Sequence, residues 1–482
     1  MLFNSIDFAV FLPIVFILYW ALGSNKIKEQ NLLLFLVSYV FYGWWDWRFL
    51  SLIFFSTLVD YTIGVSLKTN NKPGQRKVLL WASIIVNLGF LGFFKYYNFF
   101  LDNFISAFTF FGGSFTASSL QIILPVGISF YTFQTLSYSI DVYKRKLEPT
   151  RDFIAFGAFV SFFPQLVAGP IERATNLLPQ FYKKRRFNYS NAVNGLKQIL
   201  WGFFKKVVIA DNCAEFANQI FNNSADYSGS SLLVGALFFT FQIYGDFSGY
   251  SDIAIGTSRL FGFNLMKNFA FPYFSRDIAE FWRRWHISLS TWFRDYLYIP
   301  LGGSKGGTKM KIRNTFIIFI VSGFWHGANW TFIVWGALNA IYFLPLLLAN
   351  KNRSNINIVA ENSYFPSIRE FFGMLTTFSL TVLAWVFFRA DNISHAFVIL
   401  NEIFSTSLFQ APSIDGGKSL KITAVLTIIF VIVEWFGRSG EFALDLIGKS
   451  WKRPIRWGFY YVVLMAIFWF TGKQQEFIYF QF

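Results

Sequence analysis

The chain is poor in cysteine and in charged residues. Cys213 is the only cysteine among 482 residues, which excludes an intramolecular disulfide and any metal cluster held by several thiolates. Charged residues make up 14% of the chain, whereas a typical soluble domain has about 25%, and hydrophobic residues reach 54%. A chain of this composition lacks the polar surface to face water on every side.

Long apolar stretches recur along the chain. Segments of roughly the 20-residue length that crosses a bilayer lie at 6–22, 49–67, 78–94, 120–140, 232–261 and 330–349, and later ones at 371–388, 422–436 and 457–471. No basic region precedes the first, so we expect it to be retained rather than cleaved as a signal peptide. The pattern predicts an all-α polytopic membrane protein with one integral-membrane domain: N-terminal spans (1–145), a core (146–350) and C-terminal spans (351–482).

Acidic residues are scarce as well, since 26 Asp and Glu stand against 42 Lys and Arg, a net charge of +16. A basic excess can indicate nucleic-acid binding, but here the basic residues lie in short loops between apolar stretches. Cationic short loops mark the cytoplasmic side of membrane proteins. We therefore expect a lipid bilayer and no nucleic acid as partner, with the N-terminus outside and the first, third and fifth spans running inward.

Three central segments do not fit simple spans. The apolar segment 153–169 is interrupted by Pro164 and basic at both ends, which predicts a re-entrant segment. The segment 271–300 alternates aromatic and charged residues, and has a similar character. The segment 315–325 offers only 11 residues, about half of a hydrocarbon core ~30 Å thick. His326 follows it, so we expect this residue near the middle of the bilayer.

Histidine is also scarce, with three residues in the whole chain. His326 lies in the string SGFWHGANW, between two apolar segments. Burial of a titratable ring in such a segment costs free energy, so a residue of this kind is taken as a functional candidate. A neutral imidazole held away from water can act as a general base toward a hydroxyl. Trp325 and Trp330 would wall a narrow cavity, and Asn329 would orient the ring or a carbonyl. The alternative is a structural histidine that ties two helices together.

His286 is the second candidate, in the string FWRRWHISLSTWFRDY (281–296). Nearby positive charge lowers the pKa of a histidine and favours its neutral form. The same cations would suit the phosphates of a nucleotide-type donor. The alternative is an amphipathic helix at the membrane surface, with aromatics among the headgroups and charges in water. The charged residues in question are Arg283, Arg284, Arg294 and Asp295.

A third polar cluster interrupts the apolar segment 232–261. Carboxylates and hydroxyls are costly there unless they face a cavity or polar partners. A tunnel lining and a polar contact between helices both account for them. The residues are Asp246, Ser248, Ser251 and Asp252.

These motifs together resemble one family. The chain is similar to the membrane-bound O-acyltransferases, in the bacterial branch that contains alginate O-acetyltransferase and the teichoic-acid D-alanyl transferase. The resemblance runs through most of the chain, in segments 125–134, 162–173, 246–252, 281–296, 323–330 and 477–482. The essential histidine of the family, in its Trp-His-Gly motif, matches His326. The second family histidine, in Trp-His-x-Ser-Leu-Ser, matches His286.

The resemblance implies a bundle of about 11 transmembrane helices plus re-entrant segments around a central tunnel, in the bacterial inner membrane. It implies an enzyme that moves an acyl group from a cytoplasmic thioester to a hydroxyl on the extracytoplasmic side of the membrane. The bacterial branch that the chain resembles implies that this acyl group is acetyl. The donor would be acetyl-CoA or an acyl carrier protein, with no permanently bound cofactor and no metal. A cell-surface or secreted polysaccharide and an extracytoplasmic, SGNH-hydrolase-like protein would be its partners.

Two other classes remain open from the residues. A transporter or flippase of a lipid-linked glycan would use the histidines as a proton relay, and usually shows repeated halves. No internal repeat is visible here, which weighs against it. A scaffold for a polymer synthase would need neither histidine.

Overall fold

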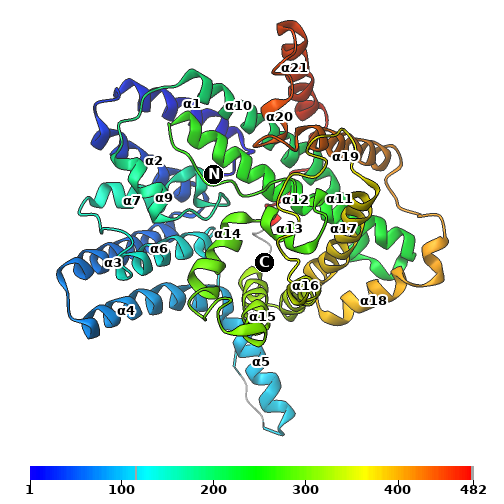
Figure 1. Cartoon of the computed structure of the whole chain (residues 1–482), viewed down its shortest axis with the longest axis horizontal. Helices are drawn as coiled ribbons and strands as arrows, with labels where there is room; N and C mark the ends of the chain where they lie inside the picture. Colours follow the sequence, from blue (N-terminus) through cyan, green and yellow to red (C-terminus); the bar gives the residue numbers. More distant parts are fainter. Residues whose placement is uncertain (114–116, 479–482) are drawn as a thin grey trace. The chain divides into compact units, whose positions relative to one another are not determined.

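The computed structural model describes residues 1–113 and 117–478, and every regular element in these ranges is helical. The chain forms two compact units. Unit 1 comprises Met1–Gly195 and Thr257–Met266, and unit 2 comprises Leu196–Gly256 and Lys267–Phe482 (Figure 1). The predicted division at residues 145 and 350 stays a prediction.

Unit 1 packs around polar side chains buried between helices. Asp60 on α3 is fully buried and accepts hydrogen bonds from Ser83 on α4, from Asn87 (2.7 Å) and from Ser139 on α6 (2.6 Å). Three donors satisfy the carboxyl group, so it ties three helices together. The helices are α1 (Ile6–Ala21), α2 (Ile27–Asp46), α3 (Leu50–Thr69), α4 (Pro73–Leu91), α5 (Tyr97–Phe110), α6 (Ile128–Tyr143), α7 (Phe153–Ser161), α8 (Phe163–Leu166) and α9 (Ala174–Leu177).

Two predictions for this unit meet different outcomes. The segment 153–169 is broken as expected, because α7 ends at Ser161 and α8 begins just before Pro164. The span expected from residue 120 is wrong at its start, since α6 begins only at Ile128. Gly127 precedes it with φ 77°, and a Cβ there would lie 2.5 Å from the carbonyl oxygen of Leu166, so only glycine fits this turn.

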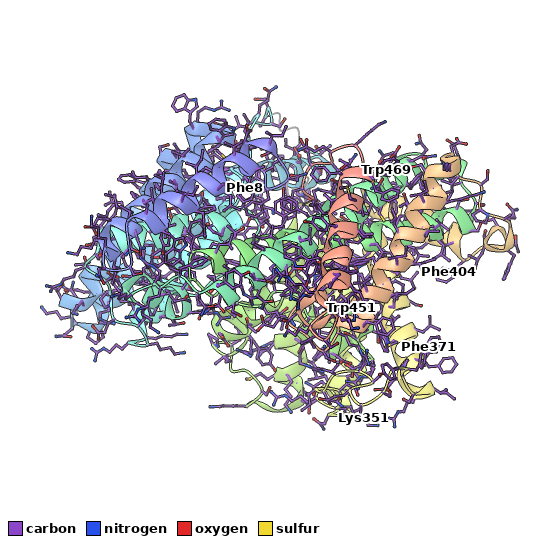
Figure 2. The ribbon with its side chains drawn as sticks, turned by 90° about the horizontal axis from the view of Figure 1, so that it is seen from above. Phe8, Lys351, Phe371, Phe404, Trp451 and Trp469 are labelled. Carbon is purple, nitrogen blue, oxygen red and sulfur yellow. The ribbon has the colours of Figure 1, made fainter. Side chains whose placement is uncertain are left out.

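Unit 2 is built around α12 (Gly229–Leu260), whose last turn belongs to unit 1. Exposed apolar side chains such as Phe371, Phe404 and Trp469 lie on its outside (Figure 2). The other helices are α11 (Asp211–Asn222), α13 (Ile278–Arg284), α14 (Ile287–Phe293), α15 (Gly307–His326), α16 (Trp330–Leu348), α17 (Ile368–Arg389), α18 (Ile393–Ile403), α19 (Gly417–Gly437), α20 (Ala443–Leu446) and α21 (Arg453–Trp469).

The predicted 11-residue helix at 315–325 is wrong in length. Helix α15 has 20 residues, because the basic stretch before residue 315 is helical rather than a loop. It packs closely against α16: a Cβ on Gly323 would lie 2.1 Å from the carbonyl oxygen of Phe332, and one on Gly336 2.4 Å from that of Phe319. His326 is the last residue of α15.

The structure confirms the all-α polytopic class. Within residues 1–113 and 117–478, six helical stretches are long and apolar enough to cross a membrane: Ile27–Thr69, Pro73–Phe110, Gly229–Leu260, Trp330–Leu348, Ile368–Arg389 and Gly417–Gly437. Shorter apolar helices at Ile6–Ala21, Phe153–Leu166 and Ile393–Ile403 accompany them. The expected total of about 11 crossings, the re-entrant paths and the central tunnel stay predictions.

Candidate active site

His286 lies at a sharp turn between two short helices. The turn is fixed by the segment before α13: the amide of Ala270 donates to the carbonyl of Arg284 and the amide of Ile287 donates to that of Asn268, both at 2.9 Å. His286 itself has φ 44°, in the left-handed region, and occupies the N-cap position of α14. Its side chain is 1% exposed. The backbone therefore directs this imidazole into the interior of unit 2.

Asn268 fixes which nitrogen of His286 carries the proton. Its Oδ1 lies 3.0 Å from Nδ1 of His286 and accepts hydrogen bonds from the hydroxyl (2.8 Å) and the backbone amide (3.4 Å) of Ser288. Its Nδ2 donates to Ser251 Oγ at 2.9 Å. A backbone amide can only donate, so the oxygen of the Asn268 side chain faces His286. Nδ1 of the neutral ring must then be the donor, and Nε2 keeps its lone pair.

The Nε2 lone pair is available within the described part of the chain, where no group forms a hydrogen bond with it. His286 lies outside the six candidate spans. Burial lowers its pKa to about 3, which keeps the ring neutral at physiological pH. The sequence predicted this neutral form from neighbouring arginines. The cause is instead loss of solvent around the ring.

Aromatic rings connect the two candidate histidines. The ring centroid of Trp325 lies 6.1 Å from that of His286 and 4.9 Å from that of His326. His326 is 3% exposed and also contacts Trp335 (5.2 Å) and Phe388 (5.4 Å), from α16 and α17. The structure thus brings together His286, His326 and Trp325 in a buried part of unit 2 that aromatic rings line.

Asn329 and Trp330 take other positions. The Asn329 side chain caps α16 by accepting the amide of Thr331 (3.0 Å) and donates to the carbonyl of Asp391 (2.9 Å). Oδ1 therefore caps α16 while Nδ2 binds a backbone carbonyl between α17 and α18, and the predicted role of orienting the His326 ring stays a prediction. Trp330 is 51% exposed, so it does not wall a narrow cavity as expected.

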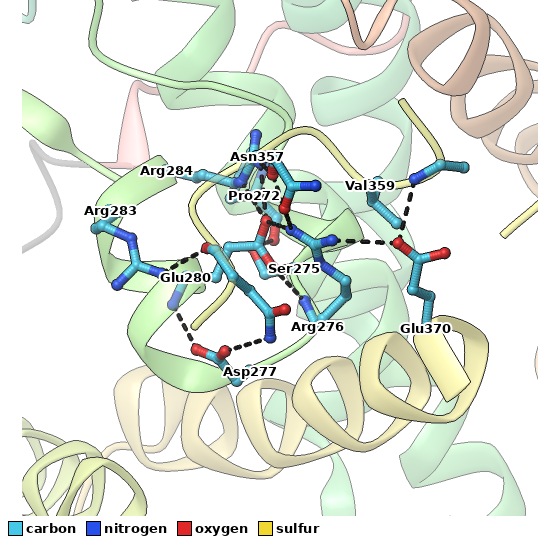
Figure 3. A network of polar contacts seen from close by, with 12 residues as sticks. Pro272, Ser275, Arg276, Asp277, Glu280, Arg283, Arg284, Asn357, Val359 and Glu370 are labelled. Atoms are coloured by element: carbon cyan, nitrogen blue, oxygen red, sulfur yellow. Dashed lines mark hydrogen bonds and ion pairs between the residues drawn. The ribbon is translucent and has the colours of Figure 1, made fainter. Parts of the chain in front are cut away.

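The two arginines before His286 belong to a structural network (Figure 3). Arg284 donates to Glu280 (3.0 Å), while Arg283 donates to the backbone carbonyls of Asn352 and Asn355 (2.7 Å each). Arg276 bridges Glu280 and Glu370 in the same network. These bonds hold α13 against the loop 350–360, so Arg283 and Arg284 are engaged by the protein in this structure.

Arg294 and Asp295 pair with each other rather than with His286. The guanidinium of Arg294 lies 2.7 Å from a carboxylate oxygen of Asp295, and its side chain is 58% exposed. An exposed ion pair of this kind contributes little to stability.

The polar residues of α12 pair with two buried lysines. Lys206 lies 2.8 Å from both Asp211 and Asp246. Lys205 lies 2.7 Å from Asp252 and 3.6 Å from Glu434, and donates to Ser248 Oγ at 3.2 Å. Both lysines come from the π-helical segment Phe204–Ala210. Asp246 and Ser248 thus make polar contacts between helices, one of the two alternatives that the sequence left open.

Ser251 and Asp252 also line a small polar cavity of about 20 Å³, with Lys205, Asn268, Lys267 and Glu434. That volume is enough for one water molecule. The amide that orients His286 therefore forms part of its wall.

Two residues of the segment after α21, Phe477 and Ile478, contact α12. The amide of Ile478 donates to Asp246 (2.6 Å), and the ring of Phe477 lies 4.3 Å from that of Tyr250. Both residues are buried. The rest of the motif 477–482, from residue 479 on, lies outside the described residues.

Known proteins are similar to this chain over most of its length. The model of the membrane-bound O-acyltransferase (MBOAT) family matches residues 148–377. The probable alginate O-acetylase AlgI of Pseudomonas aeruginosa is 40% identical over 442 residues, which cover 91% of this chain and 81% of the relative. This chain belongs to the membrane-bound O-acyltransferase family. It is therefore an acyltransferase enzyme of the membrane.

Two further relatives extend the comparison. The peptidoglycan O-acetyltransferase of Helicobacter pylori is 37% identical over 429 residues, 83% of this O-acyltransferase and 79% of the relative. The teichoic acid D-alanyltransferase of Streptococcus thermophilus is 29% identical over 314 residues, 57% of this chain and 70% of the relative. The relatives differ in the polymer and acyl group that their names give.

The sequence alone did not identify several site residues of this O-acyltransferase. Asn268 precedes His286 by a whole turn-and-helix segment, and nothing in the sequence pairs the two. Lys205 and Lys206 did carry a signal, since they interrupt an apolar stretch where lone cations are costly. Glu434 offered the same signal in the apolar helix α19.

Proposed function

We propose that this O-acyltransferase moves an acetyl group from a cytoplasmic thioester, acetyl-CoA or an acyl carrier protein, to a hydroxyl on the extracytoplasmic side. The acceptor would be a cell-surface or secreted polysaccharide. The names of the relatives support this, because they describe O-acetylation of alginate and of peptidoglycan. The basic loops expected on the cytoplasmic side support the orientation.

The observation that carries the proposal is the pair of buried imidazoles that both contact the ring of Trp325. In the proposed reaction His326 accepts the proton of the acceptor hydroxyl. The oxygen then bonds to the thioester carbonyl carbon, the carbon–sulfur bond breaks, and the leaving thiolate takes the proton from the imidazolium. The products are an ester and a free thiol, so protons balance without any further reactant.

His286 would act from the donor side. Its Nε2 lone pair can accept a hydrogen bond from a substrate group, or a proton that this group releases. The aromatic surroundings exclude water, which strengthens such interactions and protects the thioester from hydrolysis.

The remaining parts of the proposal concern location and partners. A bacterial inner membrane suits a multi-pass enzyme that joins a cytosolic donor to an outer acceptor. An extracytoplasmic, SGNH-hydrolase-like protein would complete transfer to the polymer.

The deciding test replaces His326 by alanine. We expect the variant to insert and melt like the parent, but to release no CoA thiol from acetyl-CoA and to transfer no acetyl group in membranes. His395→Gln is the matched control, because this third histidine is partly exposed and bonds to Ser224 Oγ at 3.0 Å. Acetyl transfer at the parental rate by the His326 variant would remove His326 from catalysis. Absence of thiol release by the parent with every donor would instead favour transport.

A further inference from the structure

Unit 1 contains a strongly basic pocket, and none of the candidate active-site residues lines it. Its volume is about 410 Å³. Five asparagine and glutamine side chains line it together with five cations, and no carboxylate from the described residues does. The cations are Lys183, Lys184, Arg185, Arg186 and Arg259. Amide and cationic donors without any acidic acceptor form a lining suited to an anion.

Arg185 at the wall of this basic pocket is a buried charge whose hydrogen-bond partners among the described residues are neutral. It is 4% exposed and donates to the side-chain oxygens of Gln30 and Asn31 (2.8 Å to the latter) and to backbone carbonyls. Its guanidinium also stacks on Phe263 at 5.0 Å. These partners are neutral, and within the described ranges no carboxylate forms an ion pair with it. The positive potential of Arg185 is therefore not cancelled by the protein.

The position of the basic pocket indicates where its ligand comes from. Trp20, at the end of α1, lines it, and its indole donates to the carbonyl of Leu260 at 3.0 Å. Phe187 lines it as well and is 50% exposed. Aromatic side chains gather at the headgroup level of membranes. Because α1 is expected to run inward, this end of unit 1 is the expected cytoplasmic end.

We propose that the basic pocket binds a phosphate-bearing anion at the cytoplasmic surface of the membrane. Basic pockets between membrane helices on that side bind anionic lipid headgroups. The same donors would also hold the phosphates of a soluble nucleotide, such as the nucleotide part of CoA. The lipid source is independent of the proposed acyl transfer, whereas the nucleotide source rests on it.

The test compares two double variants with the same loss of charge. Lys183→Gln with Lys184→Gln removes two exposed cations of the pocket, and Lys144→Gln with Lys146→Gln removes two exposed cations elsewhere in unit 1. One probe is phosphatidylglycerol retained from mixed phosphatidylcholine nanodiscs, measured by native mass spectrometry. The other is 3′-phosphoadenosine 5′-diphosphate, titrated against the enzyme in phosphatidylcholine nanodiscs.

We expect the Lys183/Lys184 variant to bind one probe about twentyfold more weakly, on the order of fivefold for each cation, and the loss to shrink in high salt. The Lys144/Lys146 variant should bind like the parent. The proposal is overturned if the parent binds neither probe, or if both variants bind equally well. These measurements need no turnover, so they stand apart from the fate of the proposed reaction.

Discussion

Replacing Asn268 by leucine should change both the stability of the enzyme and the chemistry of His286. Leucine has a similar volume but no polar atoms, so Nδ1–H of His286 and the hydroxyls of Ser288 and Ser251 lose their partner. Ser288 Oγ lies 3.5 Å from Nδ1 of His286 and can turn toward it. At about 1–3 kcal/mol for each buried group left unsatisfied, the net loss of unfolding free energy is about 2–4 kcal/mol.

The same rearrangement should move the proton on His286. A hydroxyl that donates to Nδ1 places the ring hydrogen on Nε2, which can then no longer accept. General acid–base catalysis contributes about 10²–10⁴-fold, so we expect acyl transfer per folded enzyme to fall about 100-fold. Ser288→Ala leaves the bond between Asn268 and Nδ1 in place, and should keep nearly the parental rate.

Nitrogen-15 NMR of the enzyme labelled at histidine reads the tautomer directly, and three histidines give a resolvable spectrum. The parent should show His286 protonated at Nδ1, and Asn268→Leu should show it protonated at Nε2. The double variant Asn268→Leu with Ser288→Ala removes the competing donor and should recover part of the lost rate. A variant that is less stable but transfers acyl groups at the parental rate per folded molecule would refute this reasoning.

Two further outcomes follow from the geometry. In Asn268→Asp a buried carboxylate would lie beside His286 and raise the pKa of its ring from about 3, so the neutral form is lost at a higher pH as the pH falls. The acid limb of the pH–rate profile should therefore shift to higher pH. An unchanged profile would contradict the role of Asn268. Gly323→Ala should lower the melting temperature in detergent by separating α15 from α16, because the new Cβ would lie 2.1 Å from the carbonyl oxygen of Phe332. The control Gly458→Ala places no described atom within 4 Å of its Cβ and should be neutral or slightly stabilising. Equal melting temperatures of the two variants would show that the helix pair can relax.

The lengths of the apolar segments and the positions of helix-breaking residues predicted much of the fold. The break before Pro164 follows from the missing amide of proline, which is a local property of the chain. The start of α6 at Ile128 was missed because apolar composition alone does not distinguish helix from extended chain. The helical basic stretch before residue 315 was missed for a related reason, since charge indicates a loop only where nothing else pairs or packs the residues.

The candidate site shows a similar division. His286 and His326 were identifiable because a rare titratable residue between apolar segments is conspicuous. Their common contact with Trp325 was not, because it depends on two distant segments packing together. Asn268 was missed since its importance lies in a hydrogen bond to a residue outside its own motif.

The left-handed backbone of His286 bears on how inactive alleles at this position are interpreted. With φ 44°, most side chains would add strain of about 1–2 kcal/mol. Alanine would therefore combine a backbone defect with the loss of the imidazole, and low expression could be mistaken for lost catalysis. Asparagine tolerates this conformation, so His286→Asn is the replacement that isolates the contribution of the ring.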